Sequence, residues 1–499
     1  MFLLIFYMLS LLAWLLYKQW GLFMGGEIEN NTLYRFRSIN GLLGEKYQEL
    51  ERQSIFFAPP KLLNDPAEGF RDIYFKGDEV LWENLFKHYL ASLTNIVYDY
   101  CLFGESESLE GSVQTISPEN TIPEKLKDSW EEIKDAFFNR EELVALISHI
   151  VEWKPSTSQV ELNFYLNLIH PIALSCVLEK FGELGFVSVD ISAIVDAYKS
   201  RKSIGETMNA MREATEGEDD SIKMDFLLEY FQLQTQQFPL IYEYKSNILQ
   251  PNKRLLTSGF PFSYIANLEQ LMYPGWFTAC FMSKATNSSV WGNYGDNHTG
   301  ACLIFDAKLE DNRQHSITLN NALIGYGSNG PVKGTSSLPF HQIRYTHKQD
   351  GLNFFDSLGQ LPIPAVNRQW LTNSNGKRSA YASTFNDEWR KKYWENYYLP
   401  ITQKSKDWEY ENEYRLVLNN MGGQYENHGV TLNYNFNSLK GIIFGINTSF
   451  EHKLKIIKII EGKVRENSHY GFKFYQAYYC RRTGEIKNTE LSMVRFSRS

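Results

Sequence analysis

Apolar residues follow two different periods along the chain, and the change of period divides it into parts. Residues 33–37 and 54–58 alternate in the way that β-strands do. From about 80 to 265, apolar residues recur at helical spacing, as at Trp130 and Ile133. Strand patterns return after 275, at 276–282, 301–305, 415–418, 442–444 and 472–479. The sequence therefore predicts an α+β fold, in which a mixed or antiparallel sheet core is split by a long helical insertion.

The same patterns set the expected boundaries of the parts. The first part of the core is predicted at 30–80, the insertion at 81–268 and the second part of the core at 269–499. Residues 310–400 are predicted to be mixed and rich in loops. Thr448 to Glu451 form a capping box that opens a helix through about residue 462. The insertion is a candidate for binding a protein partner.

The first 24 residues form an apolar segment that has two interpretations. Residues 1–17 are apolar except for Ser10, and a membrane-spanning helix needs about 20 residues. The segment is either a single-pass membrane anchor or a stretch that precedes a true start at Met24. As an anchor it would hold a cytoplasmic main body at the inner membrane, because Lys18, Arg35 and Arg37 favour that orientation. Otherwise the protein is predicted to be cytoplasmic.

Charge and cysteine usage exclude several classes of protein. The 499 residues carry a formal net charge of -8, so the chain as a whole is not a polyelectrolyte that binds nucleic acid, although a local basic groove is compatible with this balance. The five cysteines are scattered and include no Cys-x-x-Cys pair. This argues against a disulfide framework and a zinc cluster, and it fits a reducing cytoplasm. No metal cofactor is predicted.

The segment 33–38 brings two arginines close together. Strand alternation puts Arg35 and Arg37 on one face and Tyr34 and Phe36 on the other. Two neighbouring guanidinium groups repel each other unless a phosphate or carboxylates lie opposite them. The pair is therefore either an anion site or a solvated strand face.

The segment Asn64-Asp65-Pro66-Ala67-Glu68 has the sequence of a helix start. Asp65 at the N-cap, Pro66 at the first helical position and Glu68 at the third form a capping box. We favour this structural interpretation over metal binding or catalysis by Asp65 and Glu68.

Residues 283–300 offer a serine, two aromatic rings and a histidine, at Ser283, Trp291, Tyr294 and His298. The two rings share one face if the segment is helical, and rings beside a polar loop suit stacking on a planar ligand. Core packing is the alternative for both rings. The histidine is a candidate acid or base, on the evidence of its side chain alone.

The stretch Asp407 to Arg415 is the firmest candidate for a functional site. Glu411, Glu413 and Arg415 are spaced by two, so on a strand they point the same way. Two carboxylates at the mouth of a buried strand raise each other's pKa and cost stability, which is tolerated mostly where it serves a function. The alternative is an ion-pair ladder centred on Arg415, with Trp408 as a packing anchor.

Taken in order, these blocks resemble the bacterial family known as domain of unknown function 2971. The matching residues are Tyr34, Arg35, Arg37, Asn64, Asp65, Pro66, Glu68, Ser283, Trp291, Tyr294, His298, Trp408, Glu411, Glu413 and Arg415. The resemblance covers about 30–75 and 275–480 and leaves out the helical insertion. The family itself implies no reaction.

An early strand with arginines, followed late in the chain by Glu-x-Glu opening an apolar strand, is also similar to ADP-ribosyltransferases. This looser resemblance implies a fold of that type, NAD as a substrate and binding of its phosphates by Arg35 or Arg37. Glu413 would stabilise an oxocarbenium-like transition state. Glu411 would orient the acceptor, and Arg415, which we count among the catalytic candidates, has no counterpart in that pattern.

The same resemblance assigns the aromatic residues and the serine. Tyr34, Trp291 or Tyr294 would stack on nicotinamide, and Ser283 would match a serine of the middle strand. The chain departs from the pattern because it has no clear Ser-Thr-Ser triplet.

Three functions follow as hypotheses. The first is an NAD-consuming, ADP-ribosyltransferase-like toxin or phage-defence effector that modifies an unknown protein or nucleic-acid acceptor. The second is a metal-dependent nuclease that uses Asp65, Glu68, Glu411 and Glu413. The third is a non-enzymatic nucleotide sensor whose helices report binding to a partner.

Overall fold

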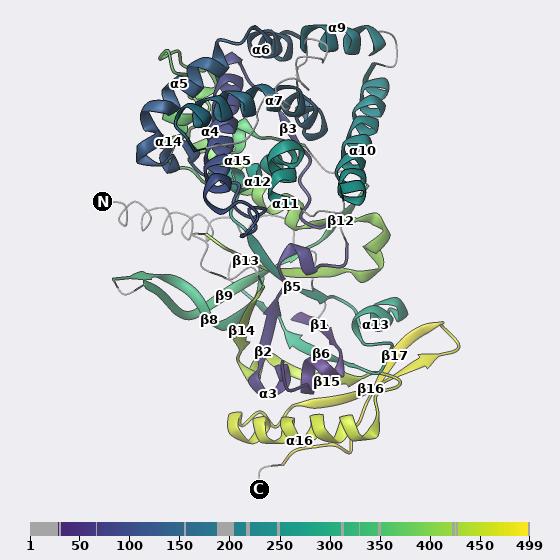
Figure 1. Cartoon of the computed structure of the whole chain (residues 1–499). Helices are drawn as coiled ribbons and strands as arrows, with labels where there is room; N and C mark the ends of the chain where they lie inside the picture. Colours follow the sequence, from purple (N-terminus) through teal and green to yellow (C-terminus); the bar gives the residue numbers. More distant parts are fainter. Residues whose placement is uncertain are drawn as a thin grey trace. The chain divides into compact units, whose positions relative to one another are not determined.

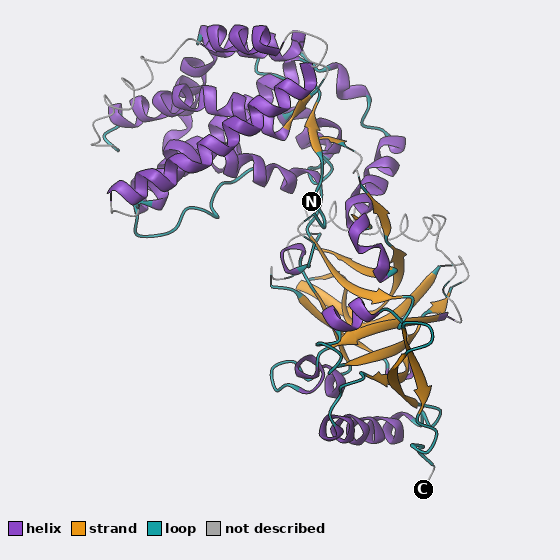
Figure 2. Cartoon of the chain, turned by 90° about the vertical axis from the view of Figure 1, so that its right-hand side faces the viewer, coloured by secondary structure: helices purple, strands orange, loops and turns teal. Residues whose placement is uncertain are grey.

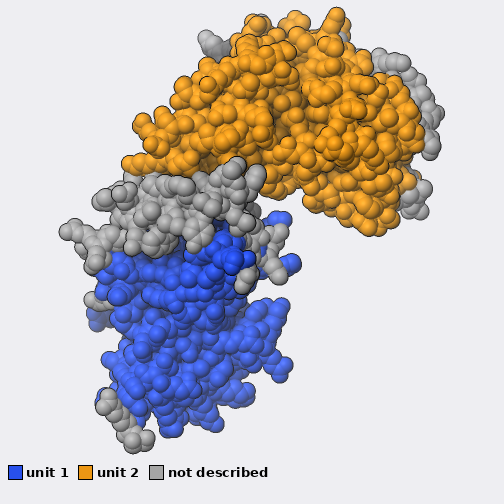
Figure 3. All heavy atoms as spheres, turned by 90° about the vertical axis from the view of Figure 1, so that its left-hand side faces the viewer, with its two compact units in different colours: residues 1–70, 274–349, 398–499 blue, residues 71–273, 350–397 orange. Residues whose placement is uncertain are grey.

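The computed structural model of the protein describes most of the chain. The described residues are 28, 31–65, 67–153, 156–186, 204–215, 220–246, 250–310, 314–328, 330–347, 351–421, 425 and 428–497. The apolar segment 1–24 and Pro66 lie outside them. Two compact units are distinguished: unit 1 holds residues 1–70, 274–349 and 398–499, and unit 2 holds residues 71–273 and 350–397 (Figure 3).

Strands dominate unit 1 and long helices dominate unit 2, so the prediction of an α+β fold is confirmed (Figures 1 and 2). The helical unit takes in residues 350–397 as well as 71–273. The short strand β11 (Leu352–Asn353) explains this, because it pairs in parallel with β3 (Ile73–Phe75). Backbone pairing therefore assigns a segment that the apolar periodicity did not separate from the core.

Unit 1 is built around one mixed sheet. Its strands are β1 (Thr32–Arg37), β2 (Ser54–Phe57), β5 (Trp276–Met282), β6 (Ala301–Asp306), β7 (Lys308–Leu309), β8 (His315–Gly327), β9 (Gly330–Gln342), β13 (Glu413–Asn419), β14 (Val430–Tyr434), β15 (Leu439–Phe444), β16 (Lys473–Cys480) and β17 (Glu485–Glu490). Their order is β17-β16-β15-β6-β1-β5-β13-β9-β8-β14-β2, with β7 beside β8. Ala58, next to β2, bridges to Thr278 in β5, so one end of the sheet curls back onto its middle.

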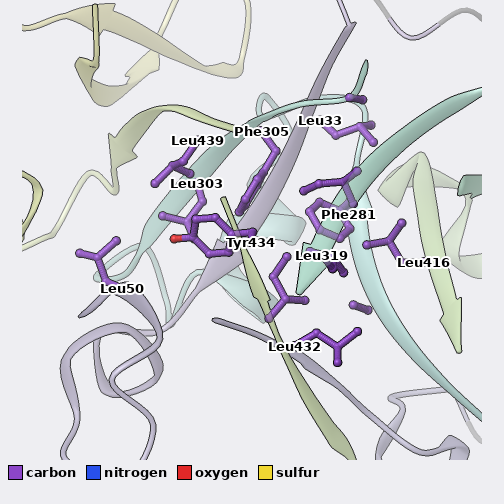
Figure 4. Close-up of a cluster of buried hydrophobic side chains, with 14 of the residues drawn as sticks. Leu33, Leu50, Phe281, Leu303, Phe305, Leu319, Leu416, Leu432, Tyr434 and Leu439 are labelled. Atoms are coloured by element: carbon purple, nitrogen blue, oxygen red, sulfur yellow. The ribbon is translucent and has the colours of Figure 1, made fainter. Parts of the chain in front are cut away.

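The curled sheet encloses an apolar core. Leu33, Phe281 and Leu416 come from the neighbouring strands β1, β5 and β13, and their side chains meet in this core (Figure 4). Successive strand residues point to opposite faces. Glu413 and Arg415, which alternate with the core residues of β13, therefore point to the other face of the sheet. The expected strands at 33–37, 276–282, 301–305 and 442–444 are all confirmed.

The helices of unit 1 are α2 (Ile39–Leu43), α3 (Glu49–Arg52), α13 (Ser288–Tyr294) and α16 (Phe450–Asn467). The helix expected near 448–462 is α16, and it extends to Asn467. Its N-cap is Ser449 rather than Thr448, because the Ser449 side chain accepts a hydrogen bond from the backbone N–H of His452. The apolar side chains of α16 at Ile456 and Ile460 are buried in the core of unit 1.

The segment that was expected to be rich in loops contains two long strands. These are β8 and β9, which pair with each other along most of their lengths. Glycine, serine and asparagine are frequent there and hide the strand period. The hydrogen bonds between the two strands do not depend on that period, and they hold the hairpin.

The elements of unit 2 are mostly helices: α4 (Glu79–Phe103), α5 (Lys127–Phe138), α6 (Glu141–Trp153), α7 (Gln159–Glu183), α9 (Ile204–Thr215), α10 (Asp220–Ser246), α11 (Pro251–Arg254), α12 (Phe260–Met272), α14 (Ile363–Gln369) and α15 (Asp387–Ile401), whose last turn crosses into unit 1, with β4 (Thr157–Ser158). By length and composition, α7 could cross a membrane. The apolar window of α7 is 67% buried within the structure, as in the core helix of a globular unit.

Candidate functional site

Five charged side chains of unit 1 meet at the start of β13. This charge cluster consists of Glu68, Lys404, Glu411, Glu413 and Arg415, and each side chain is at most 2% exposed. The Nζ atom of Lys404 lies 2.7 Å from Glu68 Oε1, 2.8 Å from Glu411 Oε2 and 3.3 Å from Glu413 Oε2. One ammonium group thus bridges three carboxylates.

The guanidinium group of Arg415 closes the cluster from the strand side. Its Nε lies 2.7 Å from Glu413 Oε1, and its Nη2 lies 2.9 Å from Glu68 Oε2. Its Nη1 donates to the backbone carbonyl of Ile401 at 2.8 Å. If all five groups are ionised, the cluster carries one more negative than positive charge.

Local backbone structure explains why these residues converge. The two-residue spacing of Glu413 and Arg415 on β13 puts both on one face, as the sequence predicted. Lys404 lies in β12 (Gln403–Ser405), which pairs in parallel with β10 (Arg344–Thr346). The 3-10 helix Lys406–Glu411 then returns the chain to β13 through Asn412, whose φ of 48° is left-handed.

The segment around Asp65 and Glu68 corrects the predicted helix cap. Residues 67–69 form a turn rather than a helix, although Asp65 Oδ1 does accept a hydrogen bond from Ala67 N. Gly69 has a φ of 74°, and a Cβ there would lie 2.4 Å from Trp276 Cζ2. Glu68, next to this close approach, contacts Lys404 and Arg415 of the cluster rather than a helix N-terminus.

Aromatic side chains surround the cluster. The Tyr294 hydroxyl donates to Glu411 Oε1 at 2.7 Å, and the Tyr345 hydroxyl accepts from the backbone N–H of Glu413 at 2.8 Å. The ring of Trp408 lies with its centroid 4.6 Å from Lys404 Nζ, a cation–π distance. Trp408 therefore packs on the cation of the site.

Burial and charge pairing separate the two glutamates of the Glu-x-Glu motif. Burial alone raises the pKa of a carboxyl, but Arg415 and Lys404 outweigh it at Glu413 and lower its pKa to about 2. At Glu411 burial dominates, and the pKa is raised. Burial likewise raises the pKa of Glu68. For Lys404 the carboxylates outweigh burial, and its pKa is raised.

The early arginines do not face the cluster, contrary to the expected phosphate clamp. Tyr34 pairs with Met282, which pairs with Glu413, so Tyr34 is the β1 residue on the side of the glutamates. Arg35 points to the opposite face, where its guanidinium lies 5.3 Å from the centroid of the Phe281 ring and donates to the carbonyls of Cys280 and Phe56.

Arg37, on the same face as Arg35, forms an ion pair with Glu49. The anion that the two arginines were expected to need is thus partly supplied by the protein itself. The residues expected to hold the phosphates of NAD do not fit that role in this arrangement.

The segment 283–300 divides between the core and the site. Trp291 is fully buried and packs edge-on against Phe36, so core packing accounts for it. His298 stacks on Trp291 at 6.5 Å, and none of its contacts among the described residues reaches the cluster. Ser283 Oγ donates to the carbonyl of Asn412 at 3.3 Å and so braces the turn between the two glutamates.

A surface pocket of about 290 Å³ borders this turn. Its lining residues are Lys284, Thr286, Asn287, Ser288, Tyr410, Asn412, Gly484 and Glu485. Within the described ranges, no group of three or more His, Cys, Asp or Glu side chains is arranged to hold a metal ion. Lys404 lies where a cation among the carboxylates would lie.

Part of the chain that contains this site matches a protein family. Residues 290–416 match the family described as protein of unknown function (DUF2971). The resemblance inferred from the sequence is confirmed over this range. The DUF2971 match holds Tyr294, Lys404, Glu411 and Glu413, and thus most of the charge cluster, while Glu68 lies outside it. No curated protein and no solved structure matches the chain at a significant level.

Sequence reasoning missed Lys404, the residue that joins the three carboxylates. It lies in Gln403-Lys404-Ser405, where no period or motif sets it apart from the other lysines. Its complete burial depends on partners from β13 and from the turn near residue 68, which only the folded chain brings together.

Proposed function

We propose that the charge cluster performs chemistry at a glycosidic bond of a nucleotide, with Glu413 and Glu411 in different roles. The observation that carries the proposal is the bridging of both carboxylates by the single Lys404 ammonium. Because Glu411 Oε2 and Glu413 Oε2 both contact Lys404 Nζ, these two oxygens lie close together. Two carboxylates at short range, with environments that push their pKa values apart, suit the cleavage of such bonds.

In this proposal Glu413 stays ionised, because Arg415 and Lys404 lower its pKa to about 2. An ionised carboxylate stabilises the positive charge that develops on the sugar as the bond to the base breaks. The base leaves with the bonding electron pair. Glu411, whose pKa is raised, accepts the proton that the attacking acceptor loses.

Access to the cluster requires motion of the segment that covers it. Glu411 and Glu413 are closed off from solvent in this structure. Lys406–Glu411 forms the adjoining 3-10 helix, and Trp408 within it covers Lys404. Displacement of this helix would expose both carboxylates next to the pocket that Tyr410 and Asn412 line.

The test compares nucleotide turnover by the whole protein and by single variants. NAD is the first substrate to try, with release of nicotinamide followed by chromatography. Glu413→Gln and Glu411→Gln should abolish or strongly reduce release, whereas Glu409→Gln on the exposed side of the same turn should not. Equal release by all four proteins, or release by none with any nucleotide or acceptor tried, would contradict the proposal. The same variants report whether toxicity on expression depends on Glu413.

A second candidate function is metal-dependent cleavage of nucleic acid. Glu68, Glu411 and Glu413 all contact the Lys404 ammonium group, so a metal ion at this position would have to replace that group. Titration with Mg²⁺ or Mn²⁺, followed by assays of DNA and RNA cleavage, separates it from the first. Thermal stabilisation by a nucleotide that is recovered unchanged would instead support the nucleotide sensor.

A further inference from the structure

The C-terminal part of the chain has a charge opposite to the rest. Residues 439–499 hold twelve Lys and Arg against five Asp and Glu, although the whole chain has a net charge of -8. Most of these acidic residues are already paired: Glu451 with Lys455, Glu461 with Arg465 and Glu490 with Lys473. The remaining cations are therefore concentrated on a local surface.

That surface lies on the hairpin of β16 and β17, at the edge of the sheet, and on the first turn of α16 (Figure 1). We name it the hairpin surface, and it consists of Phe450, Lys453, Tyr478, Arg481, Arg482 and Lys487. Tyr478 and Lys487 are partners across the two strands, so their side chains share one face. Lys453 reaches the same face, because its Nζ donates to Gln476 Oε1 at 2.6 Å and Gln476 lies two residues before Tyr478.

The hairpin surface combines exposed rings with positive charge. The rings of Phe450 and Tyr478 are 76% and 43% exposed. Arg481 and Arg482 form the exposed turn between the strands. None of the four cations pairs with a carboxylate among the described residues. Exposed rings beside unpaired cations are what a single-stranded nucleic acid requires, since its bases stack on rings and its phosphates need cations.

We infer that the hairpin surface binds single-stranded nucleic acid. A membrane surface fits less well, because the apolar face of α16, at Ile456, Ile460 and Val464, is buried in the protein core and has no apolar side left for lipid. The end of the hairpin, at Gly484 and Glu485, also lines the pocket beside Asn412. A nucleic-acid strand bound to the hairpin surface would thus lie near the charge cluster. The binding itself does not depend on the proposed reaction.

The experiment measures binding of the whole protein to fluorescently labelled oligo(dT) and oligo(rU) by anisotropy, over a range of salt concentrations. Tyr478→Ala should weaken binding about five-fold or more, the effect of losing one stacked base. The double variant Arg481→Gln with Arg482→Gln should lower the slope of log affinity against log salt by about 0.7 for each phosphate that the protein no longer neutralises. Lys455→Gln removes one positive charge from a lysine that is paired with Glu451, and it should change the affinity and its salt dependence little.

Several outcomes would overturn the inference. These are no binding to either oligonucleotide at low salt, equal loss in Lys455→Gln and in the arginine variant, and tighter binding to duplex DNA or to anionic vesicles than to single strands. The Glu413→Gln protein should bind the oligonucleotides as the wild type does. Failure of the glycosidic reaction with binding intact, or the reverse, therefore distinguishes the two proposals.

Discussion

Arg415 donates two hydrogen bonds to Glu413, the residue two positions earlier on the same strand: Nε to Oε1 at 2.7 Å and Nη2 to Oε2 at 3.1 Å. This bidentate pair fixes the orientation of both side chains. Because Glu413 is held ionised in the interior, the pair sets the charge around which Lys404, Glu68 and Glu411 are arranged. Five predictions test this arrangement and the structure around it.

Arg415→Met should destabilise unit 1 by about 3–5 kcal/mol, because removal of one partner leaves Glu413 and Glu68 as buried charges that lack their guanidinium. Hydrogen exchange of the β13 and β5 amides measures this loss within the whole protein. Lys406→Met, at a side chain that is 45% exposed, is the matched control and should change exchange little. Equal protection of β13 in wild type and Arg415→Met would show that the buried pair is dispensable.

Glu411→Gln should change how stability depends on pH. The folded protein raises the pKa of Glu411 above its ordinary value of 4.5, mainly through burial. The contribution of Glu411 to stability is therefore complete below pH 4.5 and is lost as pH rises through the folded pKa. The free energy of unfolding falls by about 1.4 kcal/mol per pH unit in the range where the folded carboxyl holds its proton and the unfolded one does not. The variant cannot lose a proton there, so its stability relative to wild type should grow as pH rises.

The lowered pKa of Glu413 predicts the opposite pH dependence of stability, at lower pH. Its folded pKa of about 2 lies below the ordinary 4.5, so its stabilising contribution is present above pH 4.5 and is lost as pH falls towards 2. Denaturant titrations give the free energy of unfolding, and we would run them from about pH 3 to about pH 8. Wild type, Glu411→Gln and the exposed control Glu409→Gln would be compared. A Glu411→Gln curve parallel to that of wild type would contradict the assignment.

Gly69→Ala should displace Glu68 from the cluster. The φ of 74° disfavours any side chain, and the added Cβ would lie 2.4 Å from Trp276 Cζ2. We expect a loss of more than about 1 kcal/mol, the scale of Gly→Ala at a positive φ. Gly471→Ala is the control, since nothing lies within 4 Å of its Cβ position. Thermal unfolding compares the two, and equal midpoints would contradict the close approach.

Two buried histidines should make unit 2 sensitive to acid. Burial lowers the pKa of His88 to about 3 and that of His170 to about 4. Each Nδ1 lies near a tyrosine hydroxyl, that of Tyr264 at 2.8 Å and that of Tyr89 at 2.7 Å, and each Nε2 lies 2.6 Å from a backbone carbonyl. Neutral rings satisfy both contacts by donating from Nε2 and accepting at Nδ1.

The unfolded chain takes up protons on these rings near pH 6.5, whereas the folded rings stay neutral until lower pH. Stability should thus be complete above pH 6.5 and fall as pH decreases towards 4, by about 1.4 kcal/mol per pH unit for each ring. Hydrogen exchange of α4 and α7 amides would record the loss. His170→Gln should reduce this dependence, and the exposed His347→Gln should not. A free energy of opening that does not change with pH would contradict the prediction.

Much of the fold could be read from the chain because alternation and helical spacing are local. The strand expected at 276–282 is β5, and Trp130, Ile133 and Phe137 are buried on one face of α5. The β8–β9 hairpin escaped notice because strand pairing, rather than apolar alternation, holds it together. Local period thus predicts those elements that pack by one apolar face, and fails where backbone pairing alone suffices.

The sequence by itself determined that Glu413 and Arg415 share a face, since two-residue spacing on a strand allows nothing else. Glu411 was expected on the same strand, but it ends a 3-10 helix and joins the cluster through Lys404. Only the tertiary structure decided what meets them. Glu68, which the sequence placed in a helix cap, and Lys404, which no sequence pattern singled out, both join the cluster. Arg35 and Arg37 instead lie on the opposite face of the sheet. The physical reason is that a buried charge requires a partner within about 4 Å, and such partners come from strands that are distant in the chain.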